Sequence, residues 1–129
     1  MKHALYLLTA IFLFGCEGGS YQSYAEYRNR NRSNLAKIEV GMSKSRVLEI
    51  MGSETHYAMT NPYKVELIPT KGGMAEVLYY YTDYINYARG EDEMDGMTPI
   101  VLKENKVVGW GRKMLDETDF RQTLRIERR

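Results

Sequence analysis

The spacing of hydrophobic residues changes at Gly52, from a helical period before it to an alternating period after it. Val47 and Met51 lie four residues apart on a segment that follows Ser43, which predicts a short helix with one apolar face. Ser43 is a favourable N-cap because its hydroxyl can accept a hydrogen bond from the first turn. Met42 and Val47 occupy the two positions of a hydrophobic staple. Gly52 is expected to end the helix in a left-handed conformation.

A helix of two turns is not stable alone, so this segment must pack on something. Leu35 and Ile38 begin an earlier apolar face, which Gly41 and Met42 interrupt, and they indicate another helical piece. The β-forming segments that follow are residues 54–60, 63–69, 76–82, 99–103 and 106–110. Glu104 and Asn105 are expected to form the tight turn between the last two segments.

Helices followed by a run of strands predict an α+β fold. We expect a two-layer sandwich, with two N-terminal helices packed on an antiparallel sheet of three to five strands, over residues 34–112. Residues 113–129 are dense in both charge signs and are predicted to form a charged tail, with or without a short helix.

The first residues have a different pattern. Lys2 and His3 precede an apolar run from Ala4 to Phe14, which is typical of an export signal. The run has about half of the roughly 20 apolar residues that a membrane-spanning helix needs. A buried helix with a core cysteine is the other alternative. Cys16 is the only cysteine of the chain, so it cannot form an internal disulfide.

Leu13-Phe14-Gly15-Cys16 resembles the lipobox of bacterial lipoproteins, although Phe14 is bulky for its position. The resemblance implies that residues 1–15 are a signal peptide and that Cys16 is acylated. Residues 16–33 would then be a flexible basic tether. The alternative is a helix, since Tyr21, Tyr24 and Tyr27 lie three apart, a spacing that puts them on one side of a helix. Glu17 follows the cysteine, where the family's sorting rule disfavours inner-membrane retention and so favours the periplasmic face of the outer membrane.

A second resemblance begins at Ile38-Glu39-Val40-Gly41-Met42-Ser43 and continues through Val47 and Met51-Gly52. This motif is similar to the entry motif of the BamE/SmpA/OmlA-like small lipoproteins, and 77–81 and 99–111 continue the similarity. Ser53 and Glu54 depart from it where that family often has proline. The resemblance implies a non-enzymatic envelope protein with a protein-binding surface. The motif residues Gly41, Met42, Ser43, Val47 and Gly52 are interpreted as scaffold.

The chain offers little for catalysis. Once the signal is removed, His56 is the only histidine, and no nucleophile–base pair or phosphate-binding glycine loop can be assembled. We therefore expect no enzyme activity, no cofactor and no metal site. The formal net charge of +1 gives no indication of nucleic-acid binding.

Three further groups are candidate contact residues. Arg28, Arg30 and Arg32 lie near the anchor, where they either touch lipid head groups or belong to a solvated tether. Glu91, Asp92 and Glu93 lie in an acidic segment that is either a solvated loop or a contact loop for a basic partner.

Tyrosines form the last candidate group, with eleven in the chain against three phenylalanines. Strand alternation puts Tyr79 and Tyr81 on one face of the sheet and Tyr80 on the other. One set must pack on the helices, and the other is either core or an open binding patch.

These observations predict a lipid-anchored envelope protein that binds another envelope protein, with an accessory role in outer-membrane assembly, including the barrel-assembly machinery, or in envelope maintenance. The alternative is an inhibitor or ligand-binding lipoprotein of similar fold that acts on a soluble enzyme or on peptidoglycan.

Overall fold

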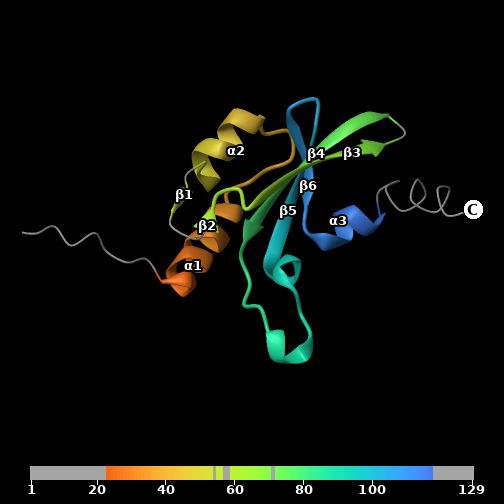
Figure 1. Ribbon diagram of the computed structural model, residues 1–129. Coiled ribbons are helices and arrows are strands. Elements are labelled where there is room, and N and C mark those ends of the chain that lie inside the picture. Colours follow the sequence, from red (N-terminus) through yellow and green to blue (C-terminus); the bar gives the residue numbers. More distant parts are fainter. Residues whose placement is uncertain (1–22, 54, 57–58, 71, 118–129) are drawn as a thin grey trace, which may run out of the picture.

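The computed structural model describes residues 23–53, 55–56, 59–70 and 72–117. Its elements are α1 (Tyr24–Leu35), α2 (Lys44–Met51), β1 (Thr55–His56), β2 (Met59–Thr60), β3 (Lys64–Thr70), β4 (Gly73–Tyr81), β5 (Met97–Lys103), β6 (Lys106–Trp110) and α3 (Arg112–Glu117). Strands β3 to β6 form one antiparallel sheet in chain order, and β1 pairs with β2 in a separate hairpin. Helices α1 and α2 lie to one side of the sheet and α3 to the other (Figure 1). The expected α+β fold is confirmed, and α3 covers the second face of the sheet.

Helix α2 forms where the sequence predicts it. The Ser43 hydroxyl accepts from the Arg46 amide at 3.3 Å, and Val47 and Met51 are buried. Gly52 has the expected positive φ of 87°, but its ψ of 152° takes it out of the left-handed helical region. The chain therefore leaves the helix in an extended direction, towards β1.

The central strands bury both faces of the sheet. Towards α2 lie the side chains of Leu78, Tyr80, Ile100, Leu102 and Val107. Towards α3 lie those of Ala75, Val77, Tyr79, Tyr81 and Val101, with Met114 and Leu115 packed against this cluster. The expected alternation of the tyrosines is confirmed. Tyr80, however, is wrong as a contact residue because its side chain is fully buried under the helices. That burial raises the pKa of Tyr80 well above its ordinary value.

The flexible tether expected over 16–33 is wrong from Ser23 onwards, where α1 begins with a capping box. The Ser23 hydroxyl accepts from the Glu26 amide, and the Glu26 carboxylate accepts from the Ser23 amide. The hydrophobic pattern does not reveal this helix because it has no apolar stripe. Tyr27 and Asn31 are its only buried residues. Cys16 and the rest of the expected tether lie outside the described residues.

The β5–β6 hairpin turns at Glu104 and Asn105, as expected, and both residues have positive φ. A register shift next to Val101 leaves Val108 as an extra residue in β6. The segment before α2 covers the outer edge of β6, since the Gly41 amide donates to the Val107 carbonyl at 2.8 Å. The predicted charged tail begins inside α3, and residues 118–129 lie outside the described part of the chain.

Candidate binding cleft

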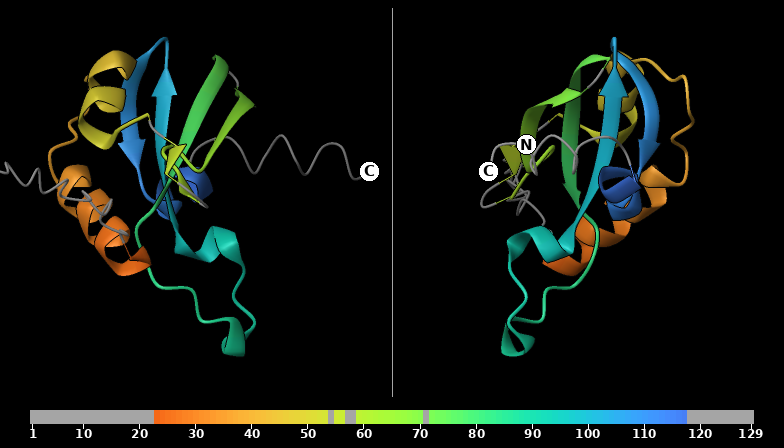
Figure 2. Two further views of the ribbon diagram at one scale, coloured as in Figure 1. Left: turned by 60° about the vertical axis from the view of Figure 1, so that its left-hand side comes forward. Right: turned by 90° about the vertical axis from the view of Figure 1, so that its right-hand side faces the viewer.

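A cleft of about 490 Å³ opens where α1 meets the long connection between β4 and β5. That connection projects beyond the end of the sheet (Figure 2) and contains two short 3₁₀ turns, Tyr87–Arg89 and Glu93–Gly96. The cleft is lined by Tyr24, Arg28, Tyr63, Tyr81, Tyr84, Ile85, Tyr87, Glu93 and Met97. Because five of these nine residues are tyrosines, we name it the tyrosine cleft.

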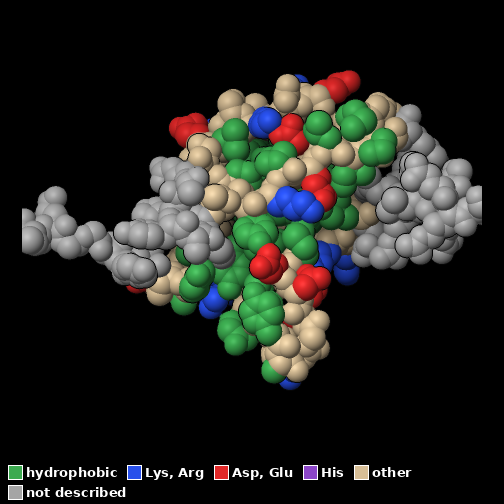
Figure 3. Space-filling view, viewed as in Figure 1, with side chains coloured by type: hydrophobic (Ala, Val, Ile, Leu, Met, Phe, Trp, Pro, Cys, Tyr) green, Lys and Arg blue, Asp and Glu red, His purple; other side chains and the backbone are tan. Residues whose placement is uncertain are grey.

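Three of the tyrosines present their rings to solvent. Tyr24 is 57% exposed, Tyr84 71% and Tyr87 65%, which is unusual for large side chains grouped around one cleft. Within the described part of the chain, their hydroxyls form no hydrogen bond. Figure 3 shows apolar and tyrosine side chains continuing from the sheet onto the base of the projecting loop. The cleft therefore offers ring faces and free hydroxyls to a ligand.

Arg28 joins the α1 wall to the floor of the cleft. Its guanidinium donates to the Tyr81 hydroxyl at 3.0 Å and lies 5.5 Å from the centroid of the Tyr81 ring. It lies 5.6 Å from the centroid of the Tyr84 ring. Cation–π contacts of this kind stabilise by about 0.5–2 kcal/mol, depending on how far the cation is desolvated. Arg28 is therefore partly occupied by the protein's own aromatic groups.

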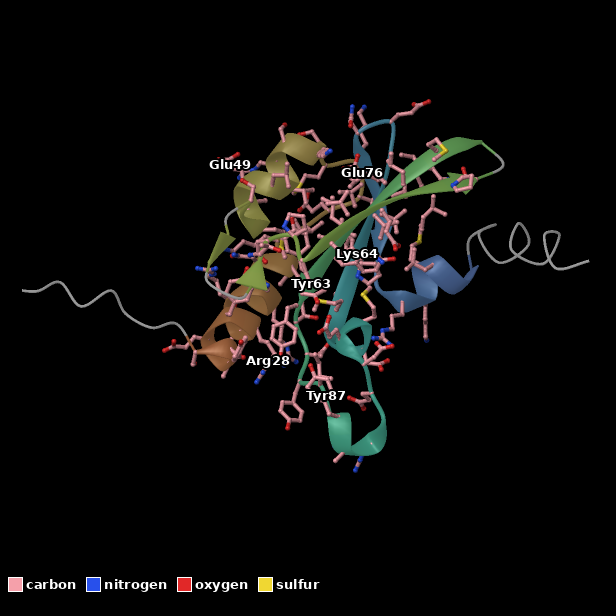
Figure 4. All side chains as sticks on the ribbon, in the orientation of Figure 1. Arg28, Glu49, Tyr63, Lys64, Glu76 and Tyr87 are labelled. Atoms are coloured by element: carbon pink, nitrogen blue, oxygen red, sulfur yellow. The ribbon has the colours of Figure 1, made fainter. Side chains whose placement is uncertain are left out.

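Tyr63 and Glu93 form a similar link on the other wall. The Tyr63 hydroxyl donates to the Glu93 carboxylate, so the start of β3 is tied to the second 3₁₀ turn. This hydrogen bond, together with partial burial, raises the pKa of Tyr63 above its ordinary value. Figure 4 shows Arg28, Tyr63 and Tyr87 gathered at this end of the molecule, from α1, the start of β3 and the loop.

The acidic segment is folded, and its carboxylates hold the loop together. Glu91 accepts from the Asn86 amide at 2.7 Å, and Asp92 caps the 3₁₀ turn by accepting from the Met94 amide at 2.8 Å. Asp95 accepts from Arg112 at 2.9 Å and from the Asp92 amide at 2.7 Å. The hydrogen bond from Arg112, together with the one from the Asp92 backbone amide, lowers the pKa of the Asp95 carboxylate. The acidic residues that the sequence singles out therefore shape the tyrosine wall.

Gly96 lets the two legs of the loop meet. The amides of Thr82 and Asp83 both donate to the Gly96 carbonyl, at 2.9 and 3.0 Å. A Cβ at Gly96 would lie 2.6 Å from Ile85 Cγ1 and 2.9 Å from the Asp83 carbonyl oxygen. No side chain fits there without moving the loop.

A buried asparagine pair positions α1, and sequence reasoning missed it. Asn31 donates to Asn61 at 3.2 Å and to the Tyr81 carbonyl at 2.9 Å. Asn61 donates back to Asn31 at 2.9 Å and to the Met51 carbonyl at 2.9 Å. This network joins α1, the end of α2 and the end of β4. It therefore fixes the helix that supplies Tyr24 and Arg28, and nothing in the alternating Arg-Asn run indicates it.

The three arginines that the sequence groups together have different surroundings. Arg28 lines the tyrosine cleft, and Arg30 lies 5.0 Å from the centroid of the Tyr27 ring. Arg32 lines a second pocket of about 350 Å³, with Asp83 and the half-exposed Trp110. Of the predicted contact residues, the structure brings Arg28 and Glu93 into one cleft.

The scaffold residues lie on the far side of the sheet from α3. Met42 packs against the cluster that contains Val47, and the Ser43 backbone bridges to Lys106 of β6.

Among the described residues, no group of three or more His, Cys, Asp or Glu side chains could hold a metal ion. In that same part of the chain, no helix is long and apolar enough to cross a membrane.

Comparison with known proteins gives one family. The profile of a family of proteins of unknown function, DUF3192, matches residues 9–117. Comparison with curated proteins and with solved structures gives no significant match. The family description assigns no activity, so the resemblance to the BamE/SmpA/OmlA-like lipoproteins stays a prediction. Because the match covers most of the sequence, the chain belongs to the DUF3192 family.

Proposed function

We propose that this protein is a lipid-anchored envelope protein whose tyrosine cleft binds another envelope protein. The observation that carries the proposal is the exposure of Tyr24, Tyr84 and Tyr87 around one cleft. Tyrosine is enriched at protein interfaces, because its ring buries a large area and its hydroxyl still forms a hydrogen bond. The role is binding, without a catalytic step.

The cleft is pre-shaped, which favours recognition. The carboxylates of Glu91, Asp92 and Asp95 accept hydrogen bonds from backbone amides and so hold the loop. The Arg28 and Glu93 contacts tie both walls to the floor of the cleft. A partner that binds a pre-formed surface does not have to order it first, so less of the interaction energy is lost.

The expected anchor keeps the cleft close to a membrane. Cys16 precedes Ser23, the N-cap of α1, by only a few residues, and that length of chain can span at most about 25 Å. Since α1 supplies Tyr24 and Arg28, the cleft stays within reach of the membrane surface. This supports a partner in or on the same membrane. The lipoprotein resemblance favours components of outer-membrane assembly, including the barrel-assembly machinery.

Affinity purification from native membranes, after chemical crosslinking, tests the proposal. The full chain is compared with Tyr84→Ser/Tyr87→Ser and with the control Val65→Ser/Leu67→Ser, whose residues are exposed on β3. We expect a partner protein that the control retains and the cleft variant loses. Cys16→Ser is expected to move the protein to the soluble fraction and to reduce recovery of the same partner.

Two results contradict the proposal. One is a cleft variant that recovers the same proteins as the full chain. The other is a Cys16→Ser protein that remains membrane-bound through its folded domain.

The second pocket supports one other candidate, a lipoprotein that binds a glycan strand such as peptidoglycan. Trp110 is 40% exposed there, beside Arg32 and Asp83. An aromatic face next to charged groups is suited to a sugar ring and its hydroxyls. In the same purification, this role predicts cell-wall material that is lost with Trp110→Ala and kept with the cleft variant.

A further inference from the structure

We propose that the tyrosine cleft takes an extended, proline-bearing segment of its protein partner in the polyproline II conformation. The inference rests on the proposed function, because it assumes that the occupant is a polypeptide. Beyond that function, it specifies the backbone conformation and the side-chain chemistry of the partner segment that enters the cleft.

Strand addition does not fit this cleft. The strand residues that line it, Tyr81 of β4 and Met97 of β5, pair with each other at the end of the sheet, beyond the last paired residues of β3 and β6. There the Tyr81 carbonyl already accepts from the Asn31 side chain, and the Met97 amide already donates to the Met94 carbonyl. An incoming strand would find no row of unpaired backbone groups, which strand addition requires.

An amphipathic helix does not fit either. Helix-binding grooves present aliphatic side chains that receive residues one turn apart. The aliphatic lining here consists of Ile85 and Met97, which are 7% and 3% exposed. The accessible apolar part of the lining is aromatic. Of the common modes of peptide recognition, aromatic-lined grooves bind polyproline II segments.

The charges of the cleft favour an uncharged segment. Arg28 donates to Tyr81 and lies over two tyrosine rings, and Glu93 accepts from Tyr63. One cation and one anion thus face the cleft, each already satisfied by a tyrosine. A charged ligand would gain little from either, whereas proline rings can pack on the Tyr87 ring and on the face of the Tyr84 ring that Arg28 leaves open.

The tyrosine hydroxyls of the cleft also suit a polyproline II segment. A polyproline II chain has no internal hydrogen bonds, so its carbonyl oxygens remain open to donors. Tyr24, Tyr84 and Tyr87 have hydroxyls that no group in the described ranges engages. They lie on both walls, on α1 and on the loop, so they can donate to carbonyls along a segment that runs between the walls.

Binding of fluorescein-labelled decaproline to the full chain, followed by fluorescence anisotropy, tests this. A Gly-Ser decapeptide and chitotetraose are the comparison ligands. We expect decaproline to bind and the other two not to bind. Tyr87→Ser should weaken decaproline binding about tenfold, as loss of an aromatic contact residue commonly does. Leu67→Ser, at a site of equal exposure on β3, should not change it.

The inference is overturned if decaproline does not bind, if the Gly-Ser peptide binds equally well, or if Tyr87→Ser leaves the affinity unchanged. Binding of chitotetraose in place of decaproline also overturns it. The proposed function fails separately, when the membrane purification shows no partner that depends on Tyr84 and Tyr87. A dependent partner without decaproline binding refutes the segment class alone.

Discussion

Asn31 and Asn61 exchange two amide hydrogen bonds in a site where their side chains are almost inaccessible to water. Each amide also donates to a backbone carbonyl, of Tyr81 and of Met51. Removing one member of such a network leaves buried groups unsatisfied, which costs more than the net value of the lost bonds. Two buried polar residues therefore set the position of α1, which forms one wall of the cleft.

Asn31→Ala is therefore expected to lower the free energy of unfolding by about 1–3 kcal/mol, because it leaves the Tyr81 carbonyl and the Asn61 amide without their partner. Urea denaturation of the purified protein measures this. Asn29→Ala is the matched control, since Asn29 is exposed on the same helix. Equal stability of the two variants would show that the network does not hold α1.

The element that matters most for the site is the projecting connection between β4 and β5. Its acidic residues accept hydrogen bonds within the loop, and Gly96 allows the loop legs to touch. Gly96→Ala should cost about 1–3 kcal/mol through overpacking against Ile85 and the Asp83 carbonyl.

We expect Gly96→Ala to make trypsin cleave faster after Arg89 at the loop tip, because the loop opens more often. It should also weaken decaproline binding. Gly72→Ala is the control, since a Cβ there meets nothing within 4 Å. Cleavage of Gly96→Ala at the control rate would mean that this glycine does not hold the loop closed.

Local signals made some elements predictable. The Ser43 cap, the staple and the Val47–Met51 spacing lie within one segment, and α2 forms there. The two-residue turn likewise places the β5–β6 hairpin. The three-residue spacing of Tyr24 and Tyr27 was the one signal for α1, and it did not separate a helix from a tether. The helix packs through polar Asn31 and Tyr27 rather than through an apolar stripe.

At the scale of the whole molecule, the cleft combines residues from Tyr24 to Met97, and no sequence window contains it. The sequence singled out Arg28 and Glu93 for their charge. The structure joins Arg28 to Tyr81, which belonged to the candidate strand tyrosines, and Glu93 to Tyr63, which had no assigned role. It buries Tyr80, which was a predicted contact residue. The tyrosine bias was a usable signal, but only the tertiary arrangement separates the core tyrosines from the exposed ones.

The tyrosine cleft is the surface that we propose meets a partner. Site-specific photo-crosslinking in living cells tests it most directly, with p-benzoylphenylalanine at Tyr87 or at Leu67. The two positions are matched at 65% and 66% exposure. We predict one discrete protein adduct from position 87 and none from position 67. An adduct from position 67 alone, the same adducts from both positions, or none from position 87 would contradict the claim.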